Sequence, residues 1–177
     1  MRYVTALALV AALATSLAAR AAAPTPAPTS APEKEDTTST TAASLAKLLD
    51  KEKLTYQQDE DRLRRTYFFT DDRSQQVFLQ PQSDVRDVGV VEIYSWVMEV
   101  KGNLTPALAK RLLEENGSQK LGYFGLEEVN GKTYVFAYHN LPTEGLTSKS
   151  LAATMISVAE MADEMEKEQL GEKSDEY

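Results

Sequence analysis

The feature that most constrains this fold is a β-hairpin signal at Asn130-Gly131. This pair separates two runs rich in aromatic and β-branched residues, at residues 121–129 and 132–139. Asn and Gly both tolerate positive φ, which the type I′ turn of a two-residue hairpin requires at its two central positions. We therefore expect an antiparallel strand pair here. Alternation along its second strand places three aromatic side chains on one face: Tyr134, Phe136 and Tyr138.

A second constraint is the run VGVVEIYSWVMEV at residues 88–100, which predicts the most apolar strand. Regular alternation divides its large apolar side chains between the two faces: Tyr94, Trp96 and Met98 on one, and Val91, Ile93 and Val97 on the other. A strand that buries only one face should alternate with polar residues, and this run does not. Two interpretations stay open: helices cover both faces of the strand, or one face is an interface.

Two helices are expected where apolar residues recur at intervals of three and four. The first covers residues 42–53, with Thr40 or Thr41 as its N-cap. The second begins at Thr105-Pro106, where a capping hydroxyl precedes a proline at the first helical position. It ends near Asn116-Gly117, a pair that tolerates the left-handed conformation common after a helix.

A third and longer helix is expected after a cap at Thr147 or Ser148, and its pattern is lost after Glu166. Its apolar stripe is Leu151, Met155, Val158, Ala162 and Met165. Its methionines are either part of a core or an adaptable surface for a partner, since Met is flexible and polarizable: Met155, Met161 and Met165. Residues 169–177 are expected to form an acidic flexible tail.

The remaining strand signals lie between the first and second helices. An extended segment starts at residues 54–56, is interrupted by acidic residues 59–61, and resumes at residues 62–70. Another strand is expected at residues 76–79, followed by a polar loop at residues 80–87. The element order is therefore α-βββ-α-ββ-α. It predicts an α+β domain at residues 42–168, with a mostly antiparallel, twisted sheet of about five strands flanked by three helices.

The N-terminus has the features of a secretory signal peptide at residues 1–21. Arg2 supplies positive charge, residues 4–17 are apolar, and Ala19-Arg20-Ala21 fits the small-residue cleavage pattern. The apolar run is shorter than the ~20 residues of a membrane-spanning helix, so we expect cleavage and no stable membrane insertion. Residues 22–41, rich in Pro, Thr and Ala, are expected to be a disordered linker. The expected location is the bacterial periplasm or the cell exterior.

The composition excludes several kinds of chemistry. The chain has no Cys and a single His, His139, so disulfides, Cys-ligated metal sites and thiol catalysis are excluded. A net charge of −8 without a broad basic stripe speaks against nucleic acid as a partner. Acidic clusters such as residues 59–61 lack the graded oxygen spacing of a calcium loop. We expect no cofactor, no metal site and no catalytic residues.

Several stretches of the chain resemble the bacterial YbjN family. They are LAKLLDKEKLTYQQDED, RTYFFTDDRSQQVFLQP, VVEIYSWV, LGYFGLEEVNGKTYVFAYHNLP and ISVAEMADEMEKE, which together span residues 42–168. The resemblance implies a fold like that of type III secretion chaperones, often paired into dimers, and a binding role without catalytic residues. Such chaperones act in the cytoplasm, whereas this chain has an export signal. The resemblance is therefore compatible with peptide or protein binding in the periplasm.

The sequence thus predicts an exported, non-enzymatic binding protein that engages a protein or peptide partner and forms a homodimer. The residues expected to contact the partner are of types enriched in interface cores: Trp96, Tyr94, Met98, Tyr134 and Phe136. An alternative is a small-ligand sensor or carrier with an apolar pocket between helix and sheet. A third hypothesis is a hydrolase that uses a carboxylate pair, and the lack of clustered His, Lys or Ser around the acids speaks against it.

Overall fold

The structure, a computed structural model, describes residues 40–85, 88–171 and 175. These residues form three helices: α1 (Ala42–Lys51), α2 (Pro106–Ser118) and α3 (Ser148–Leu170). They also form six strands: β1 (Gln57–Asp59), β2 (Arg62–Phe68), β3 (Ser74–Val85), β4 (Val88–Val100), β5 (Tyr123–Val129) and β6 (Lys132–Pro142). The predicted signal peptide, and the predicted linker up to residue 39, lie outside the described residues.

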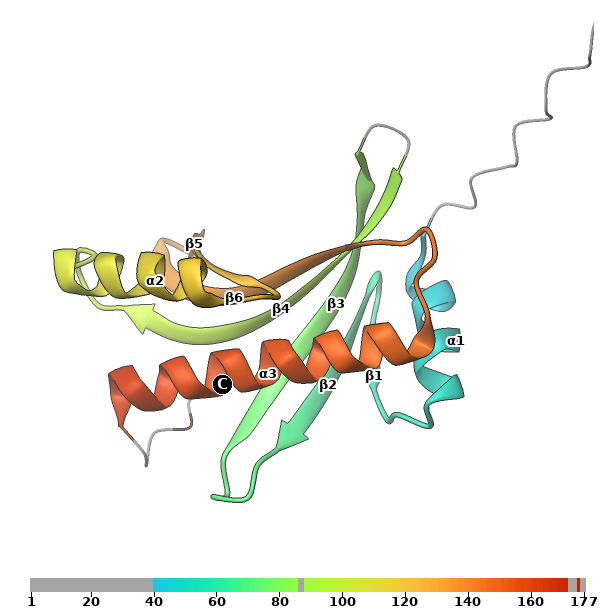
Figure 1. The fold of residues 1–177 in the computed structure, drawn as a ribbon, viewed down its shortest axis with the longest axis horizontal. Coiled ribbons are helices and arrows are strands. Elements are labelled where there is room, and N and C mark those ends of the chain that lie inside the picture. Colours follow the sequence, from blue (N-terminus) through green and yellow to red (C-terminus); the bar gives the residue numbers. More distant parts are fainter. Residues whose placement is uncertain (1–39, 86–87, 172–174, 176–177) are drawn as a thin grey trace, which may run out of the picture. The chain divides into compact units, whose positions relative to one another are not determined.

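All six of these strands belong to one antiparallel sheet, in the order β1-β2-β3-β4-β6-β5 (Figure 1). The predicted α+β class is confirmed, and the described residues form six strands where the sequence suggested about five. The additional strand arises because the acidic interruption is a hairpin turn between β1 and β2. Glu60 occupies this turn with a φ of +49°.

The helices cover one face of the sheet. α3 runs across its middle against β3, β4 and β6, while α1 packs against β2 and β3, and α2 packs against β5 (Figure 1). We call the apolar layer between helices and sheet the main core. The predicted stripe of the last helix is confirmed as part of it, since all five members are buried: Leu151, Met155, Val158, Ala162 and Met165. Met161 is buried there as well, so these methionines are core residues.

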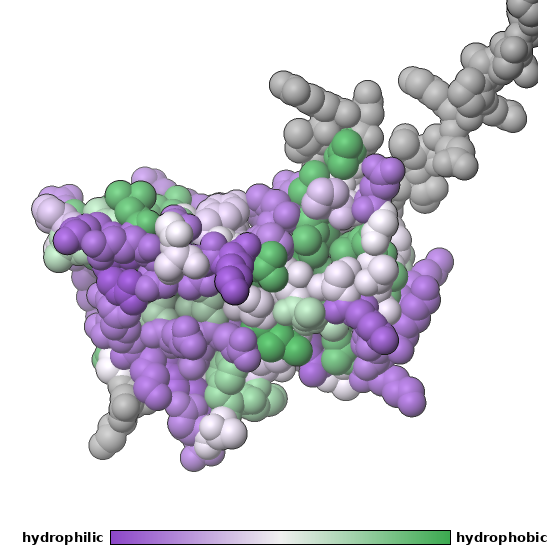
Figure 2. Space-filling view, in the orientation of Figure 1, coloured by the Kyte–Doolittle hydropathy of each residue, from purple (hydrophilic) through white to green (hydrophobic). Residues whose placement is uncertain are grey.

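The last helix is longer than predicted, because ion pairs hold its final turn. α3 continues past Glu166 to Leu170. Arg111 of α2 lies 2.7 Å from Glu168, and Lys167 lies 3.2 Å from Asp71. Hydrophilic side chains accordingly dominate the surface over α2 and the C-terminal half of α3 in Figure 2. No helix within the described ranges combines the length and the apolar content needed to cross a membrane.

A β-bulge in β4 overturns one predicted face assignment. β4 pairs with β6 at Trp96↔Phe136 and next at Met98↔Val135, so Val97 is an extra residue on β4. Val97 and Met98 therefore both turn toward the helices and lie in the main core. The prediction that Met98 shares a face with Trp96 is wrong, because regular alternation does not continue across a bulge.

β3 is also longer than predicted, since residues 80–85 continue the strand where a loop was expected. Pro81 pairs with Val91 of β4. The pairing of β3 with β2 ends at Leu79, so Pro81 lies where the described strand has a neighbour on one side only. Proline is tolerated at such an edge, where its missing N–H leaves no partner unsatisfied.

The local signals at helix starts and at the hairpin are confirmed. Thr41, Thr105 and Thr147 are the N-caps of the three helices, and each side chain accepts a hydrogen bond from the backbone N–H three residues on. Asn130 and Gly131 have φ values of +53° and +76°, as the type I′ turn requires. Residues close in sequence are sufficient to specify these features.

Gly122, just before β5, adopts a backbone conformation that suits only glycine. Its φ is +90°, and an added Cβ would lie 2.8 Å from the carbonyl oxygen of Tyr138. Gly122→Ala is expected to lower the free energy of unfolding by about 2 kcal/mol, measured by urea denaturation. Gly117→Ala is the matched control, because an added Cβ in α2 would have nothing within 4 Å there. It should raise stability by about 0.5–1 kcal/mol, and equal effects of the two changes would contradict the prediction.

Candidate functional site

The face of the sheet opposite the helices carries a group of aromatic side chains, which we call the aromatic cluster. Its members are Phe78, Tyr94, Trp96, Tyr123, Tyr134, Phe136 and Tyr138. Four of them are buried with at most 9% of their surface exposed: Phe78, Tyr94, Phe136 and Tyr138. Within the described part of the chain, no helix residue belongs to this group. The described helices therefore cover one face of β4, and aromatic rings cover the other.

The rings shield one another by packing across neighbouring strands. Phe78 of β3 stacks on Tyr94 of β4 with ring centres 5.0 Å apart. Trp96 lies 4.3 Å from Phe136 of β6, which in turn stacks on Tyr138 at 5.5 Å. Pairs at such distances add about 0.5–1.5 kcal/mol beyond the burial of their area. This mutual packing explains why the central rings are buried without a covering helix.

A hollow of about 220 Å³ opens into the aromatic cluster. Its walls are the rings of Tyr94, Trp96, Phe136 and Tyr138. Its charged groups are Arg62 of β2, Glu92 of β4 and Glu127 of β5. The hollow therefore combines apolar walls with convergent polar groups, an arrangement typical of ligand sites.

The charged groups give this hollow a negative balance. Arg62 Nη1 donates to the Tyr94 hydroxyl at 3.3 Å. Neither Glu92 nor Glu127 forms an ion pair with another described residue. Burial, and after it the charge of Glu127, raises the pKa of Glu92 above its ordinary value. Glu92 is thus half-buried in the hollow, whereas Glu127 and Arg62 are exposed at its rim.

The Tyr138 hydroxyl in the hollow is buried, and it interacts with the Glu127 carboxylate in a geometry looser than a normal hydrogen bond. Its side chain is 5% exposed. Burial raises the pKa of this hydroxyl, and the hydrogen-bonding contact with Glu127 raises it further, so the group stays protonated. Its oxygen can still accept a hydrogen bond from an N–H group of a ligand.

Four of the five residues predicted to contact a partner come together on this face. Tyr94, Trp96, Tyr134 and Phe136 belong to the aromatic cluster, whereas Met98 lies in the main core beyond the bulge. Trp96 and Tyr134 are partly exposed, and the other two are buried beneath their neighbours. A partner that approaches this face would therefore meet Trp96 and Tyr134 first.

Sequence reasoning did not assign four residues to this face: Arg62, Phe78, Glu92 and Glu127. It placed Tyr138 beside Tyr134 and Phe136, but not among the residues expected to contact a partner. Glu92 alternates with Tyr94 and Trp96 along β4, so the two-residue period was a signal that could have found it. Arg62 and Glu127 lie on β2 and β5, which are not neighbours in the sheet. No local sequence pattern predicts that Arg62 and Glu127 line the same hollow, because their proximity depends on the order and twist of the strands.

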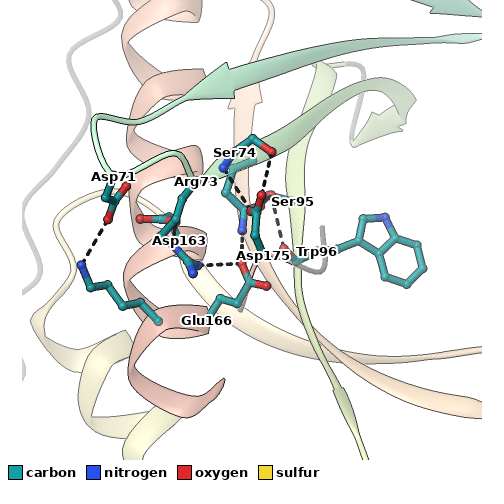
Figure 3. A network of polar contacts seen from close by, with 10 residues as sticks. Asp71, Arg73, Ser74, Ser95, Trp96, Asp163, Glu166 and Asp175 are labelled. Atoms are coloured by element: carbon teal, nitrogen blue, oxygen red, sulfur yellow. Dashed lines mark hydrogen bonds and ion pairs between the residues drawn. The ribbon is translucent and has the colours of Figure 1, made fainter. Parts of the chain in front are cut away.

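A second polar group, buried on the helix side, was also missed. We call Arg73, Asp163 and Glu166 the buried ion network (Figure 3). Arg73 Nε lies 2.6 Å from Asp163 Oδ1, and Nη2 lies 3.0 Å from Glu166 Oε2, which also accepts from Gln75 at 2.8 Å. Trp96 points away from the network in Figure 3. The network joins Arg73, the residue before β3, to α3 and is separate from the aromatic face.

The other candidate groups are dispersed. His139 is half-buried, and burial lowers its pKa. Among the residues that the structure describes, no three His, Asp or Glu side chains gather closely enough to hold a metal ion. A hollow between α2 and α3 measures about 90 Å³ and is lined by charged groups such as Arg111 and Glu164. Phe124, Met161 and Met165 also line it, so its lining mixes apolar and charged groups, whereas the small-ligand hypothesis expects an apolar pocket.

Comparison of the chain with protein-family models and with curated proteins found no match. The resemblance to the YbjN family therefore stays a prediction. Function has to be inferred from the geometry of the aromatic face.

Proposed function

We propose that this protein is a non-enzymatic binding module whose aromatic face receives a protein or peptide segment. The observation that carries the proposal is the asymmetry of the sheet. Helices pack on one face, whereas the other presents the aromatic cluster and its hollow without a covering helix among the described residues. Trp and Tyr are enriched in interface cores, where they supply large rigid contact areas.

The accessible members of the cluster are held in place before any partner arrives. Trp96 lies 4.8 Å from Tyr134 at an interplanar angle of 85°, and it also contacts the buried ring of Phe136. A side chain that is already fixed loses little rotamer entropy on binding. This arrangement supports a role for Trp96 as the central contact of the face.

A displayed peptide library tests this proposal. Peptides are selected on the purified protein, with counter-selection against Trp96→Ala. The selected peptides are expected to bind Trp96→Ala with a Kd at least about tenfold higher than their Kd for the unmodified protein, since Trp anchors commonly contribute about 2 kcal/mol or more. Trp96 is the only tryptophan of the chain. Its emission in the unmodified protein therefore reports binding at this face directly.

Leu113→Ala is the matched control for the selection. Leu113 is an apolar side chain on α2, 72% exposed and remote from the aromatic cluster. Its loss should leave the Kd of the selected peptides within about twofold, as for contacts outside a hot spot. Urea denaturation of both variants verifies that they are folded. Failure to select any peptide that distinguishes Trp96→Ala from Leu113→Ala would reject the proposal.

If the protein forms the predicted homodimer through this surface, the partner on the aromatic face is a second copy of the chain. Light scattering would then give a dimer mass that Trp96→Ala reduces to the monomer mass. A dimer unaffected by this change would place the contact between copies on another surface.

A further inference from the structure

We infer that the hollow in the aromatic cluster is a binding site for an organic cation, the ammonium or guanidinium group of a partner's Lys or Arg side chain. The inference rests on the proposed function, because it names the chemistry of the segment that the aromatic face receives. It is carried by the half-buried Glu92, the exposed Glu127 and the buried Tyr138 hydroxyl, which line one hollow with aromatic walls.

The aromatic walls attract a cation directly. The face of each ring carries partial negative charge, and a cation within about 6 Å of a ring centre gains about 0.5–2 kcal/mol. Four rings line the hollow: Tyr94, Trp96, Phe136 and Tyr138. The chain already uses this interaction at the rim, where the Arg62 guanidinium lies 5.3 Å from the ring centre of Phe78.

The carboxylates supply the counter-charge. Glu92 and Glu127 line the hollow, and Arg62 is the one positively charged group in its lining. With both glutamates ionised, the side chains that line the hollow carry a net charge of one negative unit. Like charges in a partly buried site repel each other, so a cation between the two glutamates would remove that repulsion. The net charge of −8 on the chain also attracts cations at longer range.

The Tyr138 hydroxyl adds an acceptor to the site. It lies in the lining with its side chain 5% exposed, and it interacts with the Glu127 carboxylate in a geometry looser than a normal hydrogen bond. The phenolic oxygen can accept a hydrogen bond from an N–H group. An ammonium or guanidinium group in the hollow would supply that donor.

The composition of the lining also favours an organic cation over a metal ion as the ligand. Ca²⁺ and Mg²⁺ prefer about six or more oxygen ligands in a regular shell. The hollow offers two carboxylates among ring faces, which suit a weakly hydrated organic group. Its volume of about 220 Å³ leaves room for the end of a Lys or Arg side chain, whose methylene groups would pack on the rings.

Blocked amino acids test the cation site without a partner. N-acetyl-lysine methylamide is titrated into the purified protein at constant ionic strength while Trp96 emission is followed, with N-acetyl-norleucine methylamide as the uncharged match. The lysine derivative should bind saturably with a Kd at least about tenfold lower. Glu92→Gln/Glu127→Gln should raise that Kd at least about tenfold. Glu128→Gln/Glu144→Gln, which removes two exposed carboxylates outside the hollow, should leave it unchanged.

A pH series gives a second readout. Burial and the charge of Glu127 raise the pKa of Glu92. Protonation of Glu92 removes a counter-charge, so cation binding should weaken as the pH falls through a range above that of an ordinary glutamate. The charged and titratable groups that face Glu92 are Arg62 from β2, Tyr94 beside it on β4, Tyr123 and Glu127 from β5, and Tyr138 from β6.

Three results would overturn the cation site: no saturable binding of the lysine derivative, an equal Kd for the two derivatives, or an unchanged Kd in Glu92→Gln/Glu127→Gln. Failure of the site and failure of the proposed function are distinguishable. Selected peptides that need Trp96 but no basic residue would leave the proposed function standing and overturn the cation site. Saturable lysine binding without any selected peptide would support the site and reject the peptide-binding function.

Discussion

Arg73→Met is expected to lower the free energy of unfolding by about 3–5 kcal/mol, because it leaves two carboxylates without their buried cation. The Arg73 side chain is 2% exposed and pairs with Asp163 at 2.6 Å and Glu166 at 3.0 Å. The Glu166 side chain is fully buried, so water cannot replace the lost guanidinium. Urea denaturation followed by Trp96 emission measures the change.

Arg111→Met is the matched control, since Arg111 also pairs with a glutamate of α3. Arg111 pairs with Glu168 at 2.7 Å and also with Glu115 of its own helix. The Arg111 and Glu168 side chains are 35% and 42% exposed, so water can solvate the carboxylates when the guanidinium is lost. Surface ion pairs contribute about 0–1 kcal/mol, so the control should lose little. Similar losses for Arg73→Met and Arg111→Met would contradict the assignment of a stabilising role to the network.

A double substitution tests the physical cause. Arg73→Met/Glu166→Gln removes the buried charge on α3 together with its cation, and the amide oxygen at position 166 can still accept from Gln75. Stability should recover in part relative to Arg73→Met alone, because the largest uncompensated charge is gone. If the double variant were less stable than Arg73→Met, the loss would have to come from packing.

Phe136→Ala is expected to cost about 3–5 kcal/mol, as for other large-to-small changes at buried aromatic positions. Phe136 is 2% exposed and contacts the rings of Trp96, Tyr94 and Tyr138 at 4.3, 6.0 and 5.5 Å. Its removal leaves a cavity in the aromatic cluster. Urea denaturation measures the loss, and Trp96 emission should shift to longer wavelength as water reaches the indole ring.

Phe68→Ala is the matched control on the same sheet. Phe68 lies on β2 and is 82% exposed, so the same substitution should change stability by no more than about 0.5 kcal/mol. A comparable loss in both variants would contradict the buried role of Phe136. The expected difference also means that partner contacts should be tested at Trp96, since changes at Phe136 alter the face itself.

Much of the fold was predictable because short-range chemistry decides it. Thr105-Pro106 specifies the start of α2 through one hydroxyl and one restricted φ. Asn130-Gly131 specifies the β5–β6 turn through two positive φ angles. The apolar stripe of α3 follows from the 3.6-residue period, and its two methionines, Met155 and Met165, are buried. In each case the residues that specify the feature lie close together in the sequence.

The errors share a different origin, because they depend on neighbouring strands. Regular alternation placed Met98 on the aromatic face, and the bulge at Val97, which exists only in the pairing with β6, turned it into the main core. The polar character of residues 80–87 predicted a loop, whereas pairing with β4 extends β3 through Val85. Neither outcome can be read from a single strand.

For the candidate site, the sequence by itself determined which aromatic residues alternate along each strand, including Trp96 and Phe136. Tertiary structure decided that β4 lies beside β6, which pairs these two rings, and that Arg62, Glu92 and Glu127 line one hollow. The buried ion network likewise joins Arg73 to Asp163 across 90 positions of the chain. The physical reason is the same in each case: propensities and caps act over a few residues, whereas the contacts of a site depend on how distant segments pack.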